Sequence, residues 1–377
     1  MTEEEVCDRR LLARIHRYTL DRLRKEIEPV SGQDHVRFLL RWQHVAPGTR
    51  LEGKRGVLRI VEQLQGFDIP VSVWERDILP TRVLGYKPAW LDELCLSGEV
   101  AWGRLALGRA ASDDKARALP ASAVTPVSIM RRADVPWLAA GVRESAGAVA
   151  TSTSGPTVDV LELLARRGAL FFDEIVAGSG RLRSEVERAL WEAVARGLVS
   201  ADGFQALRAL SPEAREAHRK ERGTKRGSRP SAAGLAAGRW SLFHAASAAP
   251  GAALSEEALA ERWALLLLKR YGIVCRAILE RECLTVPWRA VLRVLRRLEA
   301  RGQVRGGRFV AGLSGEQYAD PEAVDLLRSV RRTAGQGEEV TLAAVDPLNL
   351  VGILTPGARV PATPNGTVTW RDGLAVT

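Results

Sequence analysis

The stretch LEARGQVRGGRFVAGLSG, residues 298–315, decides the fold that this sequence predicts. Its five glycines and three arginines suit either a phosphate-binding loop or a turn and hairpin that close a small domain. A P-loop needs G-x-x-x-x-G-K-[ST] after a buried strand, whereas this stretch holds no lysine and follows a helical pattern, and no such motif occurs elsewhere in the sequence. We therefore interpret the glycines as turn formers: Gly302 ends a helix and Gly306–Gly307 turns a hairpin.

The same succession of helix, glycine and strand recurs at a period of about 100 residues, ending at Gly98, Gly197 and Gly302. Apolar residues at helical spacing predict helices before the last two glycines at 157–167, 171–177, 181–196, 255–271, 273–281 and 286–301. Asp202–Gly203 predicts a hairpin turn after the second copy. Three helices followed by a hairpin is the winged-helix arrangement, so the sequence predicts tandem winged helices.

The tail is richer in Val, Thr, Gly and Pro, with hairpin signals at Asn365–Gly366 and Asp372–Gly373. The predicted fold class is α+β, mainly α, with tandem winged-helix domains followed by a small C-terminal β-barrel-like unit. The predicted domains are winged-helix module(s) at 1–140, a linker at 141–156, a winged helix at 157–210, a basic flexible linker at 211–238, a winged helix at 239–315, and the β unit at 316–377.

The composition favours a nucleic-acid partner. The chain has 377 residues, 46% of them hydrophobic, and 55 Lys+Arg against 45 Asp+Glu, a net charge of +10. Part of the arginine excess can be codon bias, but the net charge remains. No apolar run approaches the roughly 20 residues of a membrane span, and the N-terminus is unlike a signal peptide. We expect a cytoplasmic protein without a membrane partner.

The four cysteines form no C-x-x-C pair, and the five histidines are not spaced as ligands. The sequence therefore predicts no metal site and no cofactor, with the cysteines reduced and buried.

Arginines at helical spacing mark the predicted third helix of the last module. Arg289, Arg293 and Arg297 share one face, and Arg305 and Arg308 extend it into the wing. Such a row suits a phosphate backbone, because the third helix and wing of these modules contact DNA. The alternative is a solvated face on a domain that packs against protein. The third helix of the middle module carries Glu185, Glu187 and Glu192 and is too acidic to read DNA.

Four strings resemble the C-terminal region of the Lhr (large helicase-related) family of bacteria. They are GVLRIVEQLQGFDIPVSVWERDILPTRVLGYKPAWLDELCLSGEVAWGRL (56–105), ERWALLLLKRYGIVCRAILERE (261–282), GGRFVAGLSGEQYADPEAVDLLR (306–328) and DPLNLVGILTPGARVP (346–361). The resemblance implies tandem winged helices, a β-barrel and DNA repair. The family's helicase core is absent from this sequence, so the resemblance implies a helicase core as partner, in the same chain or another.

This region also looks like the winged-helix DNA glycosylases, whose catalytic motif is Gln-x-Asp or Gln-x-Gln. In LQGFDIPV, Asp68 falls on the second motif position and Gly66 on the first, with Gln65 one residue earlier. The resemblance thus implies Asp68 and Gln65 as catalytic residues. That shift requires the glutamine to reach in from a displaced position.

The residues around Asp68 support a catalytic carboxylate independently. Phe67, Ile69 and Pro70 would desolvate it, and a carboxylate stabilises the oxocarbenium character of a breaking N-glycosidic bond. The alternative for Asp68 is a cap or turn former before Pro70. Asp346 and Asp372 are rival carboxylates.

The base must be flipped out or unpaired before it can react. Trp42 and Trp74 are candidate stacking residues, with core filling as the alternative, and Arg76 and Arg82 are candidate phosphate anchors.

Three functions remain open at this point. The first is a metal-free, monofunctional glycosylase that removes uracil or an alkylated base from single-stranded or damaged DNA. The second is a non-catalytic DNA-binding and oligomerisation scaffold for a helicase core, which could dock through residues 1–50. The third, binding of a specific duplex site, is disfavoured because the modules are not identical.

Overall fold

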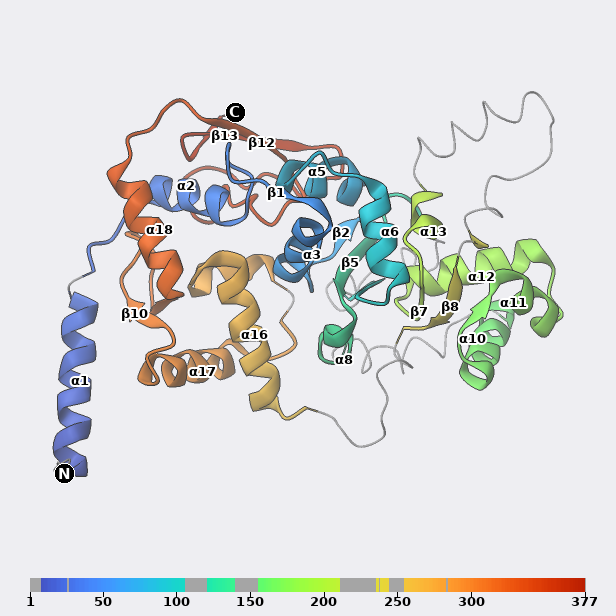
Figure 1. Ribbon diagram of the computed structural model, residues 1–377, viewed down its shortest axis with the longest axis horizontal. Helices are drawn as coiled ribbons and strands as arrows, with labels where there is room; N and C mark the ends of the chain where they lie inside the picture. The colour runs from blue at the N-terminus through green and yellow to red at the C-terminus, as the bar shows by residue number, and fades with distance from the viewer. Residues whose placement is uncertain are drawn as a thin grey trace.

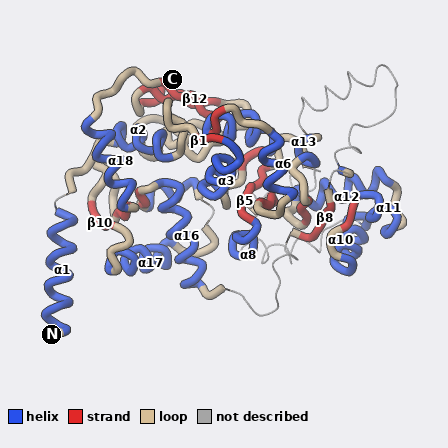
Figure 2. Tube along the Cα trace, viewed as in Figure 1, coloured by secondary structure: helices blue, strands red, loops and turns tan. Residues whose placement is uncertain are grey.

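The computed structural model describes residues 8–25, 27–105, 121–139, 155–210, 235–236, 238–243, 254–282 and 284–376. The molecule is elongated, with helix α1 (Arg9–Lys25) standing at one end and helices α10 to α12 at the other (Figure 1). Helices dominate, and the strands form small separate sheets (Figure 2). The α+β, mainly helical prediction is therefore confirmed.

Three units repeat one sheet topology. In each three-stranded sheet, the last strand in the sequence lies in the centre, between the first and the second. The three sheets are β2-β5-β4, β6-β8-β7 and β9-β11-β10, and every strand pair in them is antiparallel. With the helices that precede them, these are three winged helices, as the periodicity predicts.

The first unit extends from Gly53, where helix α3 begins, to Arg131, where strand β5 ends. Its elements are α3 (Gly53–Leu64), β2 (Ile69–Pro70), α4 (Val71–Val73), the π-helical η1 (Trp74–Ile78), α5 (Leu79–Arg82), α6 (Pro88–Leu96), β4 (Val100–Gly103) and β5 (Pro126–Arg131). Helix α2 (Gly32–Trp42) precedes it, β1 (Leu51–Glu52) pairs with β3 (Val83–Leu84), and η2 (Arg132–Asp134) and α8 (Val135–Leu138) follow it.

The second and third units follow the same order. The second contains α10 (Gly155–Arg167), β6 (Leu170–Phe171), α11 (Phe172–Ser179), α12 (Arg183–Ala195), β7 (Val199–Ala201), α13 (Gln205–Arg208) and β8 (Arg239–Leu242). The third contains α16 (Glu256–Tyr271), β9 (Ile273–Val274), the 3-10 helix η5 (Arg276–Arg281), α17 (Trp288–Ala300), β10 (Arg305–Gly307) and β11 (Gln317–Ala319).

The glycines predicted to end the third helices do so in the left-handed conformation. Gly98, Gly197 and Gly302 have φ of 76°, 67° and 72°. After Gly197 and Gly302, the next amide reaches back five residues, from Leu198 to the Ala193 oxygen and from Gln303 to the Leu298 oxygen, both at 2.9 Å. This pattern satisfies the carbonyls at the end of a helix and turns the chain into the sheet.

Two hairpin turns predicted in the winged helices are wrong. Gly306 and Gly307 lie within β10 and pair with β11, so the wing turns later, in 308–316. Asp202–Gly203 is not a two-residue hairpin turn, because β7 pairs with β8, which begins only at Arg239. Strand β8 thus completes the second sheet, although the prediction placed 239 in the last module. Most of the predicted linkers 141–156 and 211–238 lies outside the described residues.

The C-terminal unit is a small antiparallel sheet and not a closed barrel in the part of the chain that is described. Helix α18 (Pro321–Arg332) packs on α2, and β12 (Glu339–Ala343), β13 (Thr367–Arg371) and β14 (Leu374–Val376) pair in that order. Asp372–Gly373 forms the predicted two-residue turn, with Arg371 opposite Leu374. Asn365–Gly366 does not turn a hairpin, because β13 pairs with the distant β12.

Two apolar cores hold these units together. One joins α2, α16, α17, α18 and the C-terminal sheet, and the other joins the first and second units. At the junction of the first two units, Trp102 of β4 donates its indole N–H to the Gly203 oxygen at 3.1 Å and packs edge-on against Trp240. Within the described ranges, no helix has the length and apolar character that a membrane crossing needs.

Candidate functional site

The loop between α3 and β2 carries the predicted catalytic residues. Gln65 is buried, and both ends of its side-chain amide are engaged. Its nitrogen donates to Asp134 Oδ2 at 3.0 Å, and its oxygen accepts the Arg131 N–H at 3.1 Å. This side chain therefore ties the loop to the end of β5 and to η2, and these two hydrogen bonds fix the orientation of its amide.

Gly66 occupies the first position of the glycosylase motif for a conformational reason. Its φ is 84°, a region that L side chains rarely adopt. A Cβ there would also lie 3.0 Å from Leu138 Cδ2, and the Gly66 N–H donates to Ser128 Oγ at 2.9 Å. A glutamine at this position would be strained, so the departure from the motif is built into the loop.

Asp68 is half-buried immediately before β2. Its carboxylate accepts the Leu105 N–H at 3.1 and 3.3 Å, just after β4. The carboxylate thus lies where the loop of α3 meets the start of the wing of the first unit. Asp68 and Gln65 belong to the same loop, but the contacts of Gln65 are with the opposite end of β5.

A buried arginine from another unit fixes this loop. Arg270 of α16 is fully buried and donates to the backbone oxygens of Gln63, at 3.0 Å, and Gln65. Its guanidinium pairs with buried Glu282 and lies 5.7 Å from the ring centroid of Phe67. Burial lowers the pKa of Arg270, but the adjacent carboxylate outweighs it and raises the pKa above its ordinary value. The third unit therefore holds the loop of the first unit in place.

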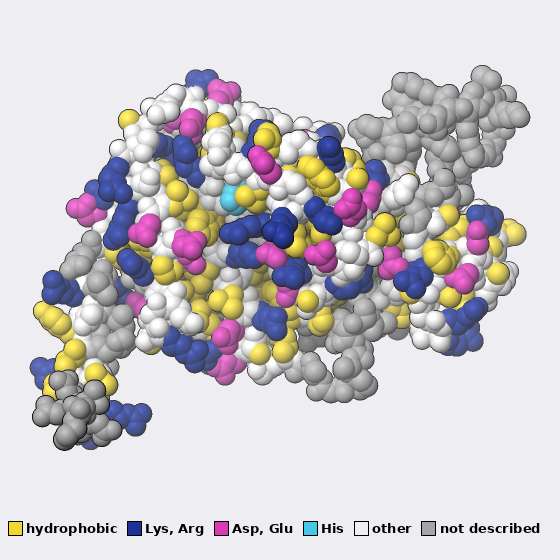
Figure 3. Space-filling view, viewed as in Figure 1, with side chains coloured by type: hydrophobic (Ala, Val, Ile, Leu, Met, Phe, Trp, Pro, Cys, Tyr) yellow, Lys and Arg dark blue, Asp and Glu magenta, His cyan; other side chains and the backbone are white. Residues whose placement is uncertain are grey.

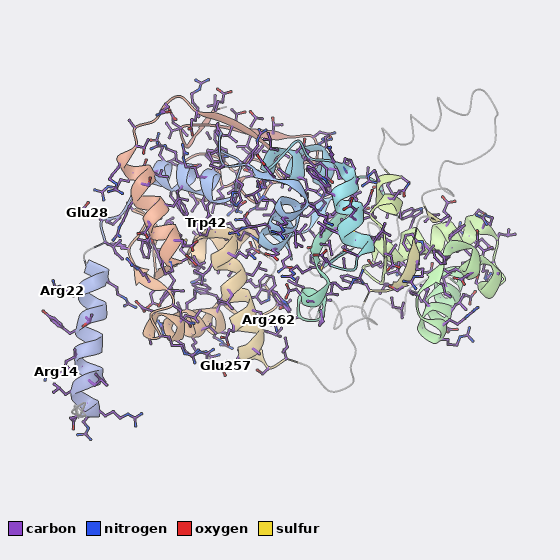
Figure 4. All side chains as sticks on the ribbon, viewed as in Figure 1. Arg14, Arg22, Glu28, Trp42, Glu257 and Arg262 are labelled. Carbon is purple, nitrogen blue, oxygen red and sulfur yellow. The ribbon has the colours of Figure 1, made fainter. Side chains whose placement is uncertain are left out.

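Two predicted nucleic-acid contacts are wrong because the side chains are inside the molecule. Trp74 is fully buried, and its indole donates to the Val127 oxygen at 2.9 Å. Arg82 is fully buried and bonds both carboxylate oxygens of Asp346, at 2.8 and 2.9 Å. Trp42 is partly exposed, at the end of α2 beside α16, and its indole donates to the Lys269 oxygen (Figure 4).

The rival carboxylates also have structural contacts. Asp346 is the buried counterion of Arg82. Asp372 is partly exposed and accepts three backbone N–H groups, from Gln336, Gly337 and Glu338. These hydrogen bonds lower the pKa of Asp372 below its ordinary value.

The arginine row of α17 is only partly available to a ligand. Arg293 pairs with Glu256 at 3.3 Å, and Arg297 pairs with Glu257 and Glu261, all of α16. Arg289 of α17 and Arg305 and Arg308 of the wing are exposed and have no ion pair among the described residues. Free cations of this module therefore include one at the start of α17 and two in the wing.

A second basic surface was not predicted from the sequence. Exposed Lys54, Arg55 and Arg59 lie on α3, and Arg50 precedes it. Figure 3 shows Lys and Arg side chains gathered over this helix, with acidic side chains among them. The run GKRGVLR carried the signal, but its helical phase was needed to show that the cations point outward.

Helix α1 exposes apolar side chains along its length. Leu11, Leu12, Ile15 and Tyr18 are each at least half exposed. Arg14 and Arg22 lie on the same helix (Figure 4). Docking of a helicase core through residues 1–50, and association of copies of the chain, remain predictions.

A groove opens between the first unit and the C-terminal sheet. It has a volume of about 310 Å³ and is lined from η1 and α5 by Arg76, Asp77 and Thr81, and from the C-terminal sheet by Thr341, Leu342, Ala343, Asn365, Gly366 and Thr367. Arg76, a predicted phosphate anchor, pairs with Asp77 at 2.8 Å and donates to the Pro364 oxygen at 2.8 Å. Its side chain is 44% exposed at this groove.

No group of three or more His, Cys, Asp or Glu side chains in the described ranges is arranged to hold a metal ion. Cys95 and Cys275 are free and buried, and burial raises the pKa of the Cys95 thiol to about 12. The expectations of a metal-free and cofactor-free site remain predictions.

Comparison with known proteins shows which family this chain resembles. Residues 30–121 and 253–339 each match a winged-helix domain model of the large helicase-related protein. A curated protein of Mycolicibacterium smegmatis, named Lhr helicase/probable uracil glycosylase, is 33% identical over 370 residues. Another, of Escherichia coli, named Lhr helicase/uracil glycosylase, is 31% identical over 401 residues. The chain is homologous to the C-terminal winged-helix region of the Lhr proteins.

Both alignments cover 93% of this chain but only 23% and 24% of the Lhr relatives. The chain thus spans about a quarter of the length of the curated Lhr proteins that it matches. The two domain matches fall on the first and third winged helices of the structure, so the Lhr resemblance and the repeated sheets agree on the architecture.

Proposed function

We propose that this chain is a DNA-binding region of an Lhr-type repair protein and that it removes uracil, or an alkylated base, from single-stranded or damaged DNA. The observation that carries the proposal is the similarity along 93% of the chain to two proteins whose names include uracil glycosylase. Asp68 is the carboxylate proposed to stabilise the oxocarbenium character of the breaking bond.

The surroundings of Asp68 support this assignment. Its carboxylate is half-buried, and Leu105 N–H holds it by a hydrogen bond. Arg270 fixes the loop before it through two backbone oxygens. A catalytic side chain must be held in a fixed position, because small displacements of it reduce the rate of the reaction steeply.

The exposed cations provide the proposed binding surface. Arg305 and Arg308 project from the wing of the third unit, and Arg55 and Arg59 from α3 of the first, where Lys54 pairs with Glu93 at 3.2 Å. Arginine contacts with phosphates would position a strand without reading its sequence. This agrees with a protein that acts on a lesion rather than on a fixed duplex site.

A non-catalytic scaffold is the second candidate. The specific observation in its favour is the glycosylase motif: glycine stands at its first position, and Gln65 is bonded at both ends. If no base is removed, Asp68 has a structural role and holds the start of the wing through the Leu105 N–H.

The test is uracil release from end-labelled oligonucleotides under single-turnover conditions. Single-stranded and duplex substrates with one uracil, one alkylpurine or no lesion would be incubated with the full chain and treated with alkali. The proposal predicts cleavage at uracil or the alkylpurine and none at the undamaged base. Binding of the oligonucleotides in gel-shift assays without any cleavage would contradict the glycosylase and favour the non-catalytic scaffold.

A further inference from the structure

The proposed base removal and the proposed phosphate contacts do not use the groove between the first unit and the C-terminal sheet. Its volume of about 310 Å³ lies at the lower end of the range for small-ligand sites, which fits a single nucleotide better than a larger ligand. One wall is η1, a π-helical segment, and such segments occur frequently at functional sites. The other wall belongs to strands more than 250 residues later in the chain.

The groove offers a neutral surface with free hydrogen-bonding groups. Arg76 and Asp77 form an ion pair, so together they give the groove no net charge, and the unused Nη1 of Arg76 remains as its cationic donor. Leu342 and Ala343 supply an apolar strip between the polar groups. These properties favour an uncharged, planar ring with polar edges.

Asn365 gives the groove its selectivity. Its side chain is exposed and makes no hydrogen bond to any described residue. It also does not turn a hairpin, which was the reason the sequence suggested for it. A free amide presents one donor and one acceptor side by side, and this edge matches the O4 and N3–H of uracil or thymine.

Arg76 lies at the same groove, bonded to Pro364 of the turn that carries Asn365. Its Nε and Nη2 are engaged with Asp77 and Pro364, whereas Nη1 makes no contact with a described residue. A phosphate next to the bound base can therefore reach this nitrogen.

We propose that the groove formed by Arg76, Asp77 and Asn365 with β12 and β13 binds one unpaired thymine or uracil nucleotide of the DNA strand. Asn365 pairs with the base edge, and Arg76 contacts a neighbouring phosphate. The proposal rests on the proposed binding of DNA, but it does not require that the base in the groove be the one that is removed.

The first experiment is photo-crosslinking of the full chain to single-stranded oligothymidine carrying one 5-iododeoxyuridine. Peptide mapping should place the crosslink in the segments 76–81, 341–343 or 363–367. Crosslinks confined to other segments, such as 50–70, would overturn the proposal.

The second experiment uses variants. Asn365→Asp removes the amide donor, and we expect at least a tenfold weaker affinity for oligothymidine, while an oligonucleotide of abasic residues is bound as by wild type. Gln336→Glu adds the same charge at another exposed position and should leave both affinities unchanged. Asn365→Ala provides a variant without added charge. Equal loss for both oligonucleotides, or no loss, would overturn the proposal.

The outcomes separate this site from the proposed activity. Groove crosslinks together with absent uracil release would keep the nucleotide site and reject the glycosylase. Uracil release with wild-type affinity in both Asn365 variants would keep the glycosylase and reject the nucleotide site.

Discussion

Arg82 and Asp346, 264 residues apart in the chain, form a fully buried ion pair in which two guanidinium nitrogens bond the two carboxylate oxygens at 2.8 and 2.9 Å. Arg82 ends α5 of the first winged helix, and Asp346 follows the first strand of the C-terminal sheet. The pair therefore links the first unit to the C-terminal unit, and with it the two walls of the groove.

Breaking this pair should destabilise the protein strongly. Arg82→Met leaves a buried carboxylate without its counterion, which costs about 3–5 kcal/mol in the free energy of unfolding. The double variant Arg82→Met/Asp346→Leu removes both charges and should recover most of that loss. Urea unfolding of the single and double variants measures this difference. Equal stability of the single variant and wild type would show that the pair is not buried.

The left-handed glycine at the end of α17 provides a test of backbone strain alone. A Cβ at Gly302 would meet nothing within 4 Å, so Gly302→Ala changes only the conformational cost of φ at 72°. We expect a loss of about 1–2 kcal/mol in unfolding free energy, with unchanged DNA affinity. Gly315→Ala, also open and left-handed but in the wing, is a matched control that should cost a similar amount.

Stability should depend on pH through His35. This side chain is fully buried, neither ring nitrogen has a hydrogen-bond partner in the described structure, and burial lowers its pKa to about 3. Its folded pKa lies below the unfolded value of about 6.5, so the unfolded chain binds the extra proton as pH falls. Its contribution is present above about pH 6.5 and is lost as pH falls towards 3.

Between pH 7 and pH 5, this linkage should lower the unfolding free energy by about 2 kcal/mol. His35→Phe removes the titrating group, so its stability should change less over the same interval in matched urea titrations. An identical pH dependence in variant and wild type would assign the effect to other groups.

DNA affinity should depend on salt through the wing arginines. The double variant Arg305→Ala/Arg308→Ala should bind more weakly and lower the log–log salt slope by about 2, because each phosphate contact contributes about 0.9. Arg166→Ala/Arg167→Ala, two exposed arginines of the second unit, is the matched control. Fluorescence anisotropy between low and moderate salt measures both slopes, and equal slopes would exclude the wing as a phosphate-binding surface.

Local patterns in the sequence predicted what depends on nearby residues. The helices before Gly197 and Gly302, the glycines that end them and the Asp372–Gly373 turn follow from spacing over a few residues. The helix predicted at 273–281 is wrong, because these residues form strand β9 and the 3-10 helix η5. The partner of β7 could not be predicted in this way. Strand β8 begins only at residue 239, so its pairing with β7 depends on contacts between distant segments.

The candidate site was predicted less well for the same reason. Trp74 and Arg82 are residue types that contact nucleic acids, but Val127 and Asp346 engage them from distant segments. The groove residue Asn365 was recognised only as a turn former. Its exposure depends on how the C-terminal sheet packs against the first unit.

The most direct test of the account compares uracil release by wild type, Asp68→Asn and Asp325→Asn on the same single-stranded substrate. Asp325 lies on α18 with a side chain that is 75% exposed, so its variant controls for the loss of one carboxylate. We expect full activity for wild type and Asp325→Asn, and at least a hundredfold slower release for Asp68→Asn at unchanged DNA affinity. Equal rates for all three proteins would contradict the assignment of Asp68, and absence of release by wild type would contradict the glycosylase itself.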